Sequence, residues 1–584
     1  MSGVDNNNYL STENLNEDGL HRRRKDDIVL PPIDSNVNDE DVNNTVDTNA
    51  RTRGEFIRSI LILVLTHGII IAYISYVTYY YISTRDTCTQ DCTLTFCSSY
   101  GMLLFVFGTL YVCLFYFKIL KPYMGKFIVN SIFSPISRGI KSLFKTLISK
   151  IILTVVLLLG FLAYILYETY EDFARLRALG GIALFVCIGF AISASPRNIN
   201  WRPVICGALF QFILGVLFIR WPVGRNIFQC FGEKVSDFLD FGKAGAAFVY
   251  GDHIVFELGV FAFAILSIIY FFSLWVSVLY YLGAMQWFLF KLGWILQSIM
   301  GTTVCESVNA AGNIFLGQSE SPLIIRPYIK HLTHSEIHAI ITSGFSTVSG
   351  SVLAAYMSFG AEPSHLITAS VMAAPASLFM AKLVWPETEE SKTSSGNIQL
   401  EKSTDTSVLD AASNGASQAI PLILNIIANL VAFVAVVAFA DGILLWITGL
   451  MGFENVDLQF ILGKVFMPLS WLIGVDWKDC EAVGNVIGTK TIINEFVAFR
   501  VLGDYIERNE ISPRSAAIAT FAICSFANPS SIGIMIGGLS ALAPERRPSI
   551  TKVALRAFVA ACFVTLCTAS IAGLLMTDEM IEGN

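Results

Sequence analysis

The sequence predicts an all-α membrane protein: a polytopic helical bundle with two re-entrant helical hairpins and broken transmembrane helices in an inverted repeat. Three observations lead to this prediction. The 584 residues are 54% hydrophobic and 15% charged, with a mean hydropathy of +0.60, which is too apolar for soluble domains. Apolar segments long enough to cross a bilayer recur along the chain. Two regions of the second half carry polar interruptions at matched spacing.

Residues 1–55 are the most polar part of the chain, and we expect them to form a disordered cytoplasmic tail. Their twelve acidic and six basic residues account for −6 of the net charge of −7, so the remainder is nearly neutral. That balance gives no support for nucleic-acid binding. Runs of Asn and Asp with few aromatic residues bury too little surface to fold alone. No cleavable signal peptide is expected, because the first apolar run starts near Phe56.

Residues 56–170 are expected to supply three extra N-terminal transmembrane helices. The 118–150 connection carries seven basic residues and no acidic one, whereas the 84–100 loop carries one basic and two acidic residues. The excess of positive charge places the 118–150 connection and the tail in the cytoplasm and the 84–100 loop outside. The apolar runs of this region lie at about 56–82, 101–118 and 151–167.

The expected outer loop contains three cysteines, Cys88, Cys92 and Cys97. An oxidising compartment makes one disulfide among them plausible. Three cysteines leave one unpaired, and the spacing leaves the pairing open.

Residues 171–300 are expected to be scaffold helices. Apolar and charged residues recur at helical spacing over 221–252, which predicts an amphipathic helix lying in the membrane interface. The expected apolar helices of this region lie at about 180–195, 203–220, 253–273 and 275–300.

Residues 301–385 and 456–545 resemble each other, and this is the strongest internal evidence for a function. The first region places Glu320 fifteen residues after the cysteine of a Cys-Glu pair, and the second places Glu495 at the same distance after another. A helix interrupted by small or polar residues follows in each region, at 343–350 and 524–531. Interrupted apolar segments at matching places in two halves indicate a secondary transporter with its site at the repeat interface.

Three other segments complete the second half. We expect residues 386–412 to be a mobile polar loop, 413–455 a long scaffold helix, and 546–584 a final transmembrane helix with a short tail.

The two glutamates leave other functions open. Non-helical backbone at membrane depth is tolerated where it lines a wet cavity, so Glu320 and Glu495 can bind a polar solute or take up a proton. A buried structural carboxylate is the ordinary alternative for either residue alone. An intramembrane acid–base enzyme would use them as a pair, and a cation channel as a selectivity ring. The repeat disfavours an enzyme, and a channel predicts flux without accumulation.

Several long motifs resemble the concentrative nucleoside transporter family, whose members couple nucleoside uptake to sodium or protons. The resemblance runs from about residue 195 to the last helix. The matching stretches are Asn313 to Leu323, Ile325 to Tyr328, Asn494 to Ala498, Phe526 to Asn528, Ser531 to Ile534 and Gly537 to Leu539.

This resemblance implies the roles of individual residues. Gln318, Ser319 and Glu320 would face the nucleobase, Glu495, Asn528 and Ser531 would hold the ribose hydroxyls, and Val352 and Phe526 would pack around the ligand. The sodium ligands would be the Asn313 side chain, the Leu316 and Val348 carbonyls and Thr347. Hard oxygen ligands suit Na⁺.

The resemblance also implies wider properties of the protein. It implies a homotrimer in the plasma membrane that takes up purine and pyrimidine nucleosides, such as uridine and adenosine, by an elevator-like movement, with no cofactor besides the coupling ion. The sequence departs from the usual family residues at Ser319, Thr347, Phe499 and Ser525. Sodium or proton coupling, its stoichiometry and the exact base preference stay open.

Three histidines, His331, His334 and His338, lie in a polar connector and include an i, i+4 pair. That spacing lets two imidazoles share a metal, but the His-Glu-x-x-His pattern is missing. The sequence therefore does not favour a metal site at these histidines.

Overall fold

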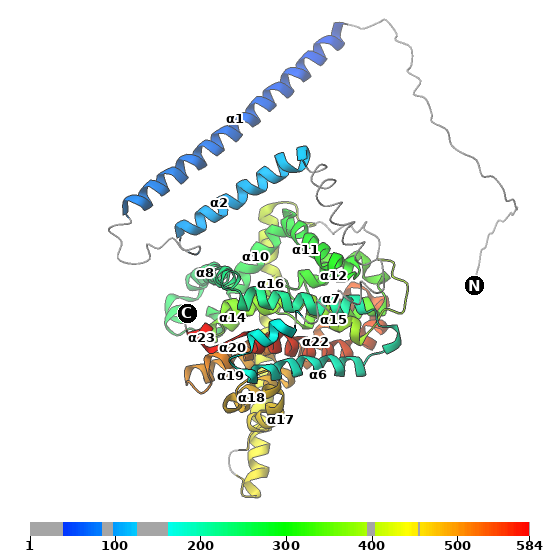
Figure 1. Cartoon of the computed structure of the whole chain (residues 1–584). Coiled ribbons are helices and arrows are strands. Elements are labelled where there is room, and N and C mark those ends of the chain that lie inside the picture. Colours follow the sequence, from blue (N-terminus) through cyan, green and yellow to red (C-terminus); the bar gives the residue numbers. More distant parts are fainter. Residues whose placement is uncertain are drawn as a thin grey trace, which may run out of the picture. The chain divides into compact units, whose positions relative to one another are not determined.

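The computed structural model describes residues 39–84, 97, 99–124, 160, 162–393, 403–453 and 456–582, and every regular element in these ranges is a helix (Figure 1). Contacts divide the chain into two units, residues 1–94 and 95–584. Seven of the described helices are long and apolar enough to cross a membrane. The predicted all-α class is confirmed.

The first unit is represented by one helix, α1 (Asp39–Thr84). The sequence analysis assigned residues 39–55 to the tail, and the structure places them in this helix. Residues 1–38 lie outside the described part.

The second unit begins with α2 (Ser99–Phe115), which continues as the π-helix η1 (Tyr116–Met124). After the short η3 (Phe173–Leu176) come α6 (Arg177–Ala191) and α7 (Trp201–Gly215), and α7 continues as η5 (Val216–Arg220). The Asn200 side chain accepts a hydrogen bond from the backbone N–H of Arg202, which fixes the start of α7.

The predicted amphipathic helix over 221–252 is present as α8 (Pro222–Tyr250). Pro222 occupies its first turn, where a missing N–H costs nothing. Gly251, with a φ of 95°, ends it in a conformation that side chains rarely adopt.

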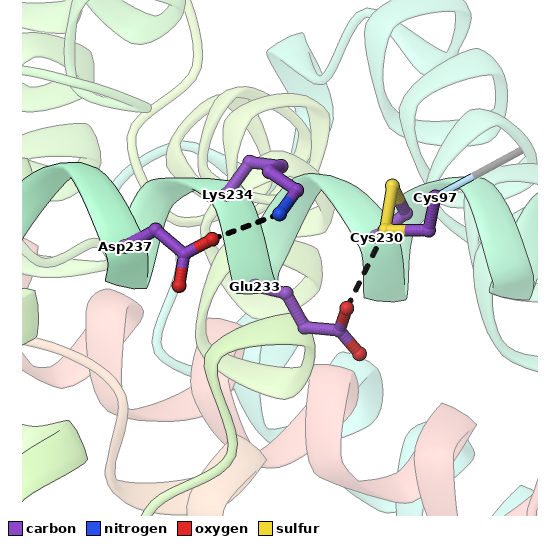
Figure 2. Close-up of a disulfide and its surroundings, with 5 residues drawn as sticks. All are labelled: Cys97, Cys230, Glu233, Lys234 and Asp237. Carbon is purple, nitrogen blue, oxygen red and sulfur yellow. Dashed lines mark hydrogen bonds and ion pairs between the residues drawn. A yellow bond between two sulfur atoms is a disulfide. The ribbon is translucent and has the colours of Figure 1, made fainter. Parts of the chain in front are cut away.

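A disulfide joins α8 to Cys97, two residues before the start of α2. Cys97 bonds to Cys230, with the two Cα atoms 5.4 Å apart, and the Glu233 carboxylate lies 3.4 Å from the Cys97 sulfur (Figure 2). The sequence analysis left the pairing of the three loop cysteines open and did not consider Cys230. The structure pairs Cys97 with this cysteine 133 residues away, because folding and not spacing brings the two together. Cys88 and Cys92 lie outside the described residues.

The region after α8 contains more breaks than expected. It folds as η6 (His253–Glu257), α9 (Phe261–Ala264), α10 (Ile268–Tyr281) and α11 (Ala284–Met300). The expected boundary near residue 274 is wrong. The break falls instead at Gly283, which has a φ of 76° and can reverse the chain without a Cβ clash.

Two helical hairpins occupy the two regions that matched in sequence. The first consists of α12 (Val304–Gly312) and the 3-10 helix η7 (Ser321–His331). The second consists of α18 (Cys480–Ile492) and α19 (Glu495–Glu507), and α17 (Leu458–Leu472) packs along α18.

A broken helix follows each hairpin, as predicted. The first is α13 (His334–Phe345), then η8 (Gly350–Val352) and α14 (Leu353–Ser358). The second is α20 (Pro513–Ile523), then α21 (Pro529–Leu542).

Three long helices complete this unit: α15 (Pro363–Val384), α16 (Val408–Leu450) and α22 (Arg547–Leu575), followed by the short α23 (Asp578–Glu582). The core lies where α15 and α22 pack against each other, against α13 and against the early helices α6 and α7. The 43-residue α16 packs along α10 and extends past its neighbours at one end (Figure 1).

The start of the predicted loop over 386–412 is ordered against the core. Thr393 is 3% exposed, and the hydroxyls of Ser391 and Thr393 both donate to the Glu336 carboxylate. Glu336 is the third residue of α13 and caps its N-terminus. The expectation of a mobile solvent loop is therefore wrong for residues 387–393, because their hydroxyls satisfy a buried carboxylate.

Candidate substrate and ion site

One cavity lies where both hairpin tips and both helix breaks meet. Its lining includes all eight residues expected to bind substrate: Gln318, Ser319, Glu320, Val352, Glu495, Phe526, Asn528 and Ser531. They come from four separate segments of the chain, so the fold brings together what the sequence spreads over more than 200 residues. Carboxylates, amides and hydroxyls converge there beside apolar side chains, which is the usual composition of a site for a small polar ligand.

The second hairpin presents a carboxylate that the next broken helix holds in place. Glu495 is the first residue of α19, and Asn528 is the N-cap of α21. The Asn528 amide donates to a Glu495 carboxylate oxygen at 2.6 Å. The Asn528 side-chain oxygen accepts from the backbone N–H of Ser531 at 3.0 Å. These two hydrogen bonds hold the Glu495 carboxylate at the cavity, where a carboxylate can accept a hydrogen bond from a ligand hydroxyl.

The tip of the first hairpin is a tight turn that positions Glu320. The backbone N–H of Gly317 donates to the Glu320 carboxylate at 3.2 Å. The Gln318 amide reaches across to the Ser531 hydroxyl at 3.4 Å, while its side-chain oxygen is buried and has no partner among the described residues. Because Gln318 lines the cavity, this buried acceptor is suited to a ligand N–H.

The two arms of the first hairpin approach very closely below the tip. The Ser321 hydroxyl donates to the Asn309 carbonyl at 2.8 Å. A Cβ at Gly312 would lie 2.5 Å from the same hydroxyl oxygen, so only glycine allows this approach.

Backbone hydrogen bonds join the broken helices and the first tip. The N–H of Phe526 donates to the Thr347 carbonyl at 3.2 Å, and the N–H of Gly350 donates to the Phe315 carbonyl at 3.0 Å. The groups freed by the helix breaks are thus used between segments rather than left unpaired.

The four expected sodium ligands lie in two breaks of the first half: Asn313 and Leu316 follow α12, and Thr347 and Val348 lie between α13 and η8. Asn313 is fully buried, and its amide donates to the Ser343 hydroxyl at 3.0 Å. Its side-chain oxygen has no hydrogen-bond partner in the described part of the chain. Leu316, Thr347 and Val348 are buried as well. An unpartnered buried oxygen is costly unless a donor or cation meets it, so the Asn313 oxygen is suited to be a ligand of a hard cation.

The three histidines lie away from the cavity. His334 contacts Glu389 at 2.6 Å, and both His334 and His338 lie beside the Trp385 ring. Burial raises the pKa of the Glu389 carboxyl, but the hydrogen bonds and charge of His334 outweigh it, so this pKa lies below its usual value. Among the described residues, no group of three or more potential ligands could hold a metal ion.

Similarity to known protein families extends over most of the second unit, residues 95–584. Three family models match: "Na+ dependent nucleoside transporter N-terminus" at residues 180–253, "Nucleoside recognition" at 262–363 and "Na+ dependent nucleoside transporter C-terminus" at 365–573. Sodium/nucleoside cotransporter 1 of Oryctolagus cuniculus is 40% identical over 496 residues, which cover 82% of this chain and 74% of that protein.

The chain belongs to the concentrative nucleoside transporter family. Solute carrier family 28 member 3 of Homo sapiens is 45% identical over 414 residues, and that of Eptatretus stoutii shows the same identity over the same length. These alignments cover 68% of this chain but only 60% of each relative, so the chain spans less than two thirds of their length.

Solved structures of the family have the same fold. CNTnw in an inward-facing substrate-bound state matches with a TM-score of 0.65 and 39% identity, covering 69% of this chain and 98% of that chain. A variant of CNTnw in an outward-facing state matches with a TM-score of 0.65 and 38% identity, over the same shares of both chains. The matched family consists of transporters and not of enzymes.

The sequence analysis did not predict that α16 forms one wall of the cavity. Leu422, Ile426, Asn429 and Leu430 of α16 line it, together with Ser349, Asn494, Phe496, Ser530 and Ile534 from segments near the expected residues. The sequence signal in this part of α16 was two asparagines, Asn425 and Asn429, within an otherwise apolar stretch, and such residues do not reveal which face of a helix meets a cavity.

Proposed function

We propose that the protein is a secondary active transporter that couples nucleoside uptake to a sodium gradient. The observation that carries this proposal is that Glu495, Asn528, Gln318 and Glu320 line one and the same cavity. A ribose diol pairs naturally with a carboxylate and an amide, and a nucleobase edge pairs with amide and carboxylate oxygens. The family to which the chain belongs supports the same substrate class.

Coupling follows from the short distance along the chain between ion and substrate ligands. Asn313 and Leu316 would bind sodium, and Gln318 follows Leu316 by two residues. A cation that orders this turn also orders the base-binding side chains. Each ligand then favours the other, and the coupling is reciprocal by thermodynamic linkage.

The two hairpins would enter the membrane from opposite faces. Three candidate spans, 334–358, 363–384 and 408–450, lie between them in sequence. An odd number of crossings places the entry of the second hairpin on the other side, as an inverted repeat requires. Both tips then reach the middle of the bilayer, where alternating access is possible.

The mobile part would carry both hairpins, both broken helices, α15 and α22. Because α6 and α7 pack on α15 and α22, we assign them to this part as well, so that the scaffold consists of α8, α10 and α16. We further propose an elevator-like movement, a homotrimer in the plasma membrane and a cytoplasmic N-terminus.

The test is uptake of radiolabelled uridine and adenosine in cells that lack nucleoside transport, with sodium, with choline, and with choline at acid pH. We expect uptake of both nucleosides above the external concentration in sodium only. Accumulation in choline at acid pH would show that a proton, and not sodium, is the coupling ion. Accumulation of one of the two nucleosides alone would restrict the proposed substrates to that class of nucleoside. Equilibration without accumulation would identify a channel and contradict the proposal.

A further inference from the structure

The long helix α16 forms one wall of the cavity. It contributes Leu422, Ile426, Asn429 and Leu430, and all other lining residues come from the hairpins and the helix breaks. The positions i, i+4, i+7 and i+8 lie on one face of an α-helix, so this face of α16 meets the cavity. Asn429 is the one polar residue on that face.

The Asn429 amide is left without a hydrogen-bond partner in the described part of the chain. Its side chain is half-buried, and the helix around it is apolar. An amide carries two donor hydrogens and one acceptor oxygen, and leaving them unmet away from water costs about 1–3 kcal/mol. Within the described part of the chain, the polar space that Asn429 lines is the interior of the cavity.

We propose that Asn429 is a direct contact to the nucleoside and helps to set which nucleosides are accepted. The inference rests on the proposed function, which it extends to the α16 wall of the cavity. An amide can bind a donor and an acceptor that lie side by side on a nucleobase edge, and the loss of such a contact discriminates strongly because a buried partner is left unmet.

The position of Asn429 makes the contact dependent on the state of the transporter. α16 packs along α10, and beyond that it touches α17 and α19. If the cavity moves past α16 during transport, Asn429 meets the nucleoside only while the cavity lies beside it. It therefore acts on substrate recognition at that step rather than throughout the cycle.

The chain offers a matched control on the same helix. Asn425 lies one turn before Asn429, is exposed, and is not among the residues that line the cavity. Asn429→Leu and Asn425→Leu are the same chemical change, from a branched amide to a branched hydrocarbon with the same number of side-chain heavy atoms. Only the first removes the amide from the cavity.

The experiment measures sodium-driven uridine uptake per transporter at the cell surface for the wild type and both variants. We expect Asn429→Leu to raise the KM about 5- to 30-fold, the factor that corresponds to about 1–2 kcal/mol, and Asn425→Leu to leave it within twofold. Equal KM values for the two variants would overturn the inference. A wild type without sodium-driven uptake would instead contradict the proposed function.

A panel of uridine analogues, each lacking one base or ribose hydrogen-bonding group, separates a direct contact from a structural role. We expect the difference between wild type and Asn429→Leu to disappear for the analogue that lacks the bonded group. Asn429→Asp keeps the size of the side chain and its acceptor oxygen, so it serves as a second variant in case Asn429→Leu fails to fold. We expect it to change the order in which the transporter prefers the analogues. A penalty that is the same for every analogue in both variants would show that Asn429 only supports the wall.

Discussion

The two hairpins share their spacing in sequence, yet the protein anchors them differently. In the first, Glu306 of α12 is 1% exposed and pairs with Lys382 of α15 at 2.8 Å. In the second, Glu481 of α18 occupies the corresponding place with its side chain 44% exposed and pairs with Lys464 of α17 at 2.7 Å. Both tips line one cavity. The burial of the hairpin arms, in contrast, depends on the helices that surround them.

The returning arms differ as well. The arm of the first hairpin is a 3-10 helix with Pro327 inside, so it has fewer regular hydrogen bonds than an α-helix. The arm of the second is a regular α-helix capped by Asn494, with Glu495 at its N-terminus. An irregular turn offers carbonyl oxygens, which suit an ion, and a capped helix start presents a fixed carboxylate, which suits a sugar.

The largest effect should follow from breaking the buried anchor. Lys382→Met leaves the Glu306 carboxylate buried without a cation, which costs about 3–5 kcal/mol. We expect a marked loss of folded protein at the surface and of thermal stability in detergent. The double variant Glu306→Gln/Lys382→Met should recover much of both.

The exposed pair of the second hairpin is the control for that experiment. Lys464→Met breaks a pair whose contribution is about 0–1 kcal/mol, so surface level and thermal stability should stay near those of the wild type. Equal losses for Lys382→Met and Lys464→Met would show that the hairpins are anchored alike.

The next largest effect concerns the second tip. Glu495→Gln removes the charge that the Asn528 amide and a ribose hydroxyl would share, and we expect uridine uptake to fall about 100-fold or more at an unchanged surface level. Glu481→Gln in the same hairpin changes the same group outside the cavity and should retain uptake. Normal uptake by Glu495→Gln would place the sugar elsewhere.

The smallest of the three effects concerns the first tip. Asn313→Ala removes the unpartnered oxygen from the ion cluster, so the sodium concentration for half-maximal uptake should rise about tenfold, which corresponds to about 1.4 kcal/mol. Asn485→Ala in the second hairpin is the comparison, since that amide already donates to the Tyr505 hydroxyl. It should leave the sodium dependence unchanged. An unaltered sodium dependence in Asn313→Ala would move the ion away from the first tip.

Much of the fold could be predicted because polar residues at membrane depth stand out against an apolar background. The interruptions near Glu320 and Glu495 indicated both hairpins, and the breaks near 347 and 526 indicated both discontinuous helices. The family motifs then supplied the eight residues that the fold brings to one cavity. Local signals of this kind depend only on residues that are close in sequence.

The rest depended on contacts between distant segments. The Cys97–Cys230 disulfide, the Lys382–Glu306 pair and the α16 wall of the cavity each join residues far apart in sequence. The residues next to them in sequence show no distinctive motif, so neither hydrophobic periodicity nor residue spacing predicts these contacts. The helix boundary at Gly283 was missed for a related reason, because a glycine within an apolar run predicts a reversal only when its backbone conformation is known.

The central claim is that one site holds a nucleoside and a sodium ion whose binding is coupled through the first tip. The most direct test is the uridine dissociation constant of the purified protein, measured by calorimetry in sodium and in choline, for the wild type and Asn313→Ala. We expect sodium to tighten uridine binding to the wild type about tenfold and to have little effect on Asn313→Ala, with uridine tightening sodium binding by the same factor. A wild-type dissociation constant that is equal in sodium and in choline would contradict the account.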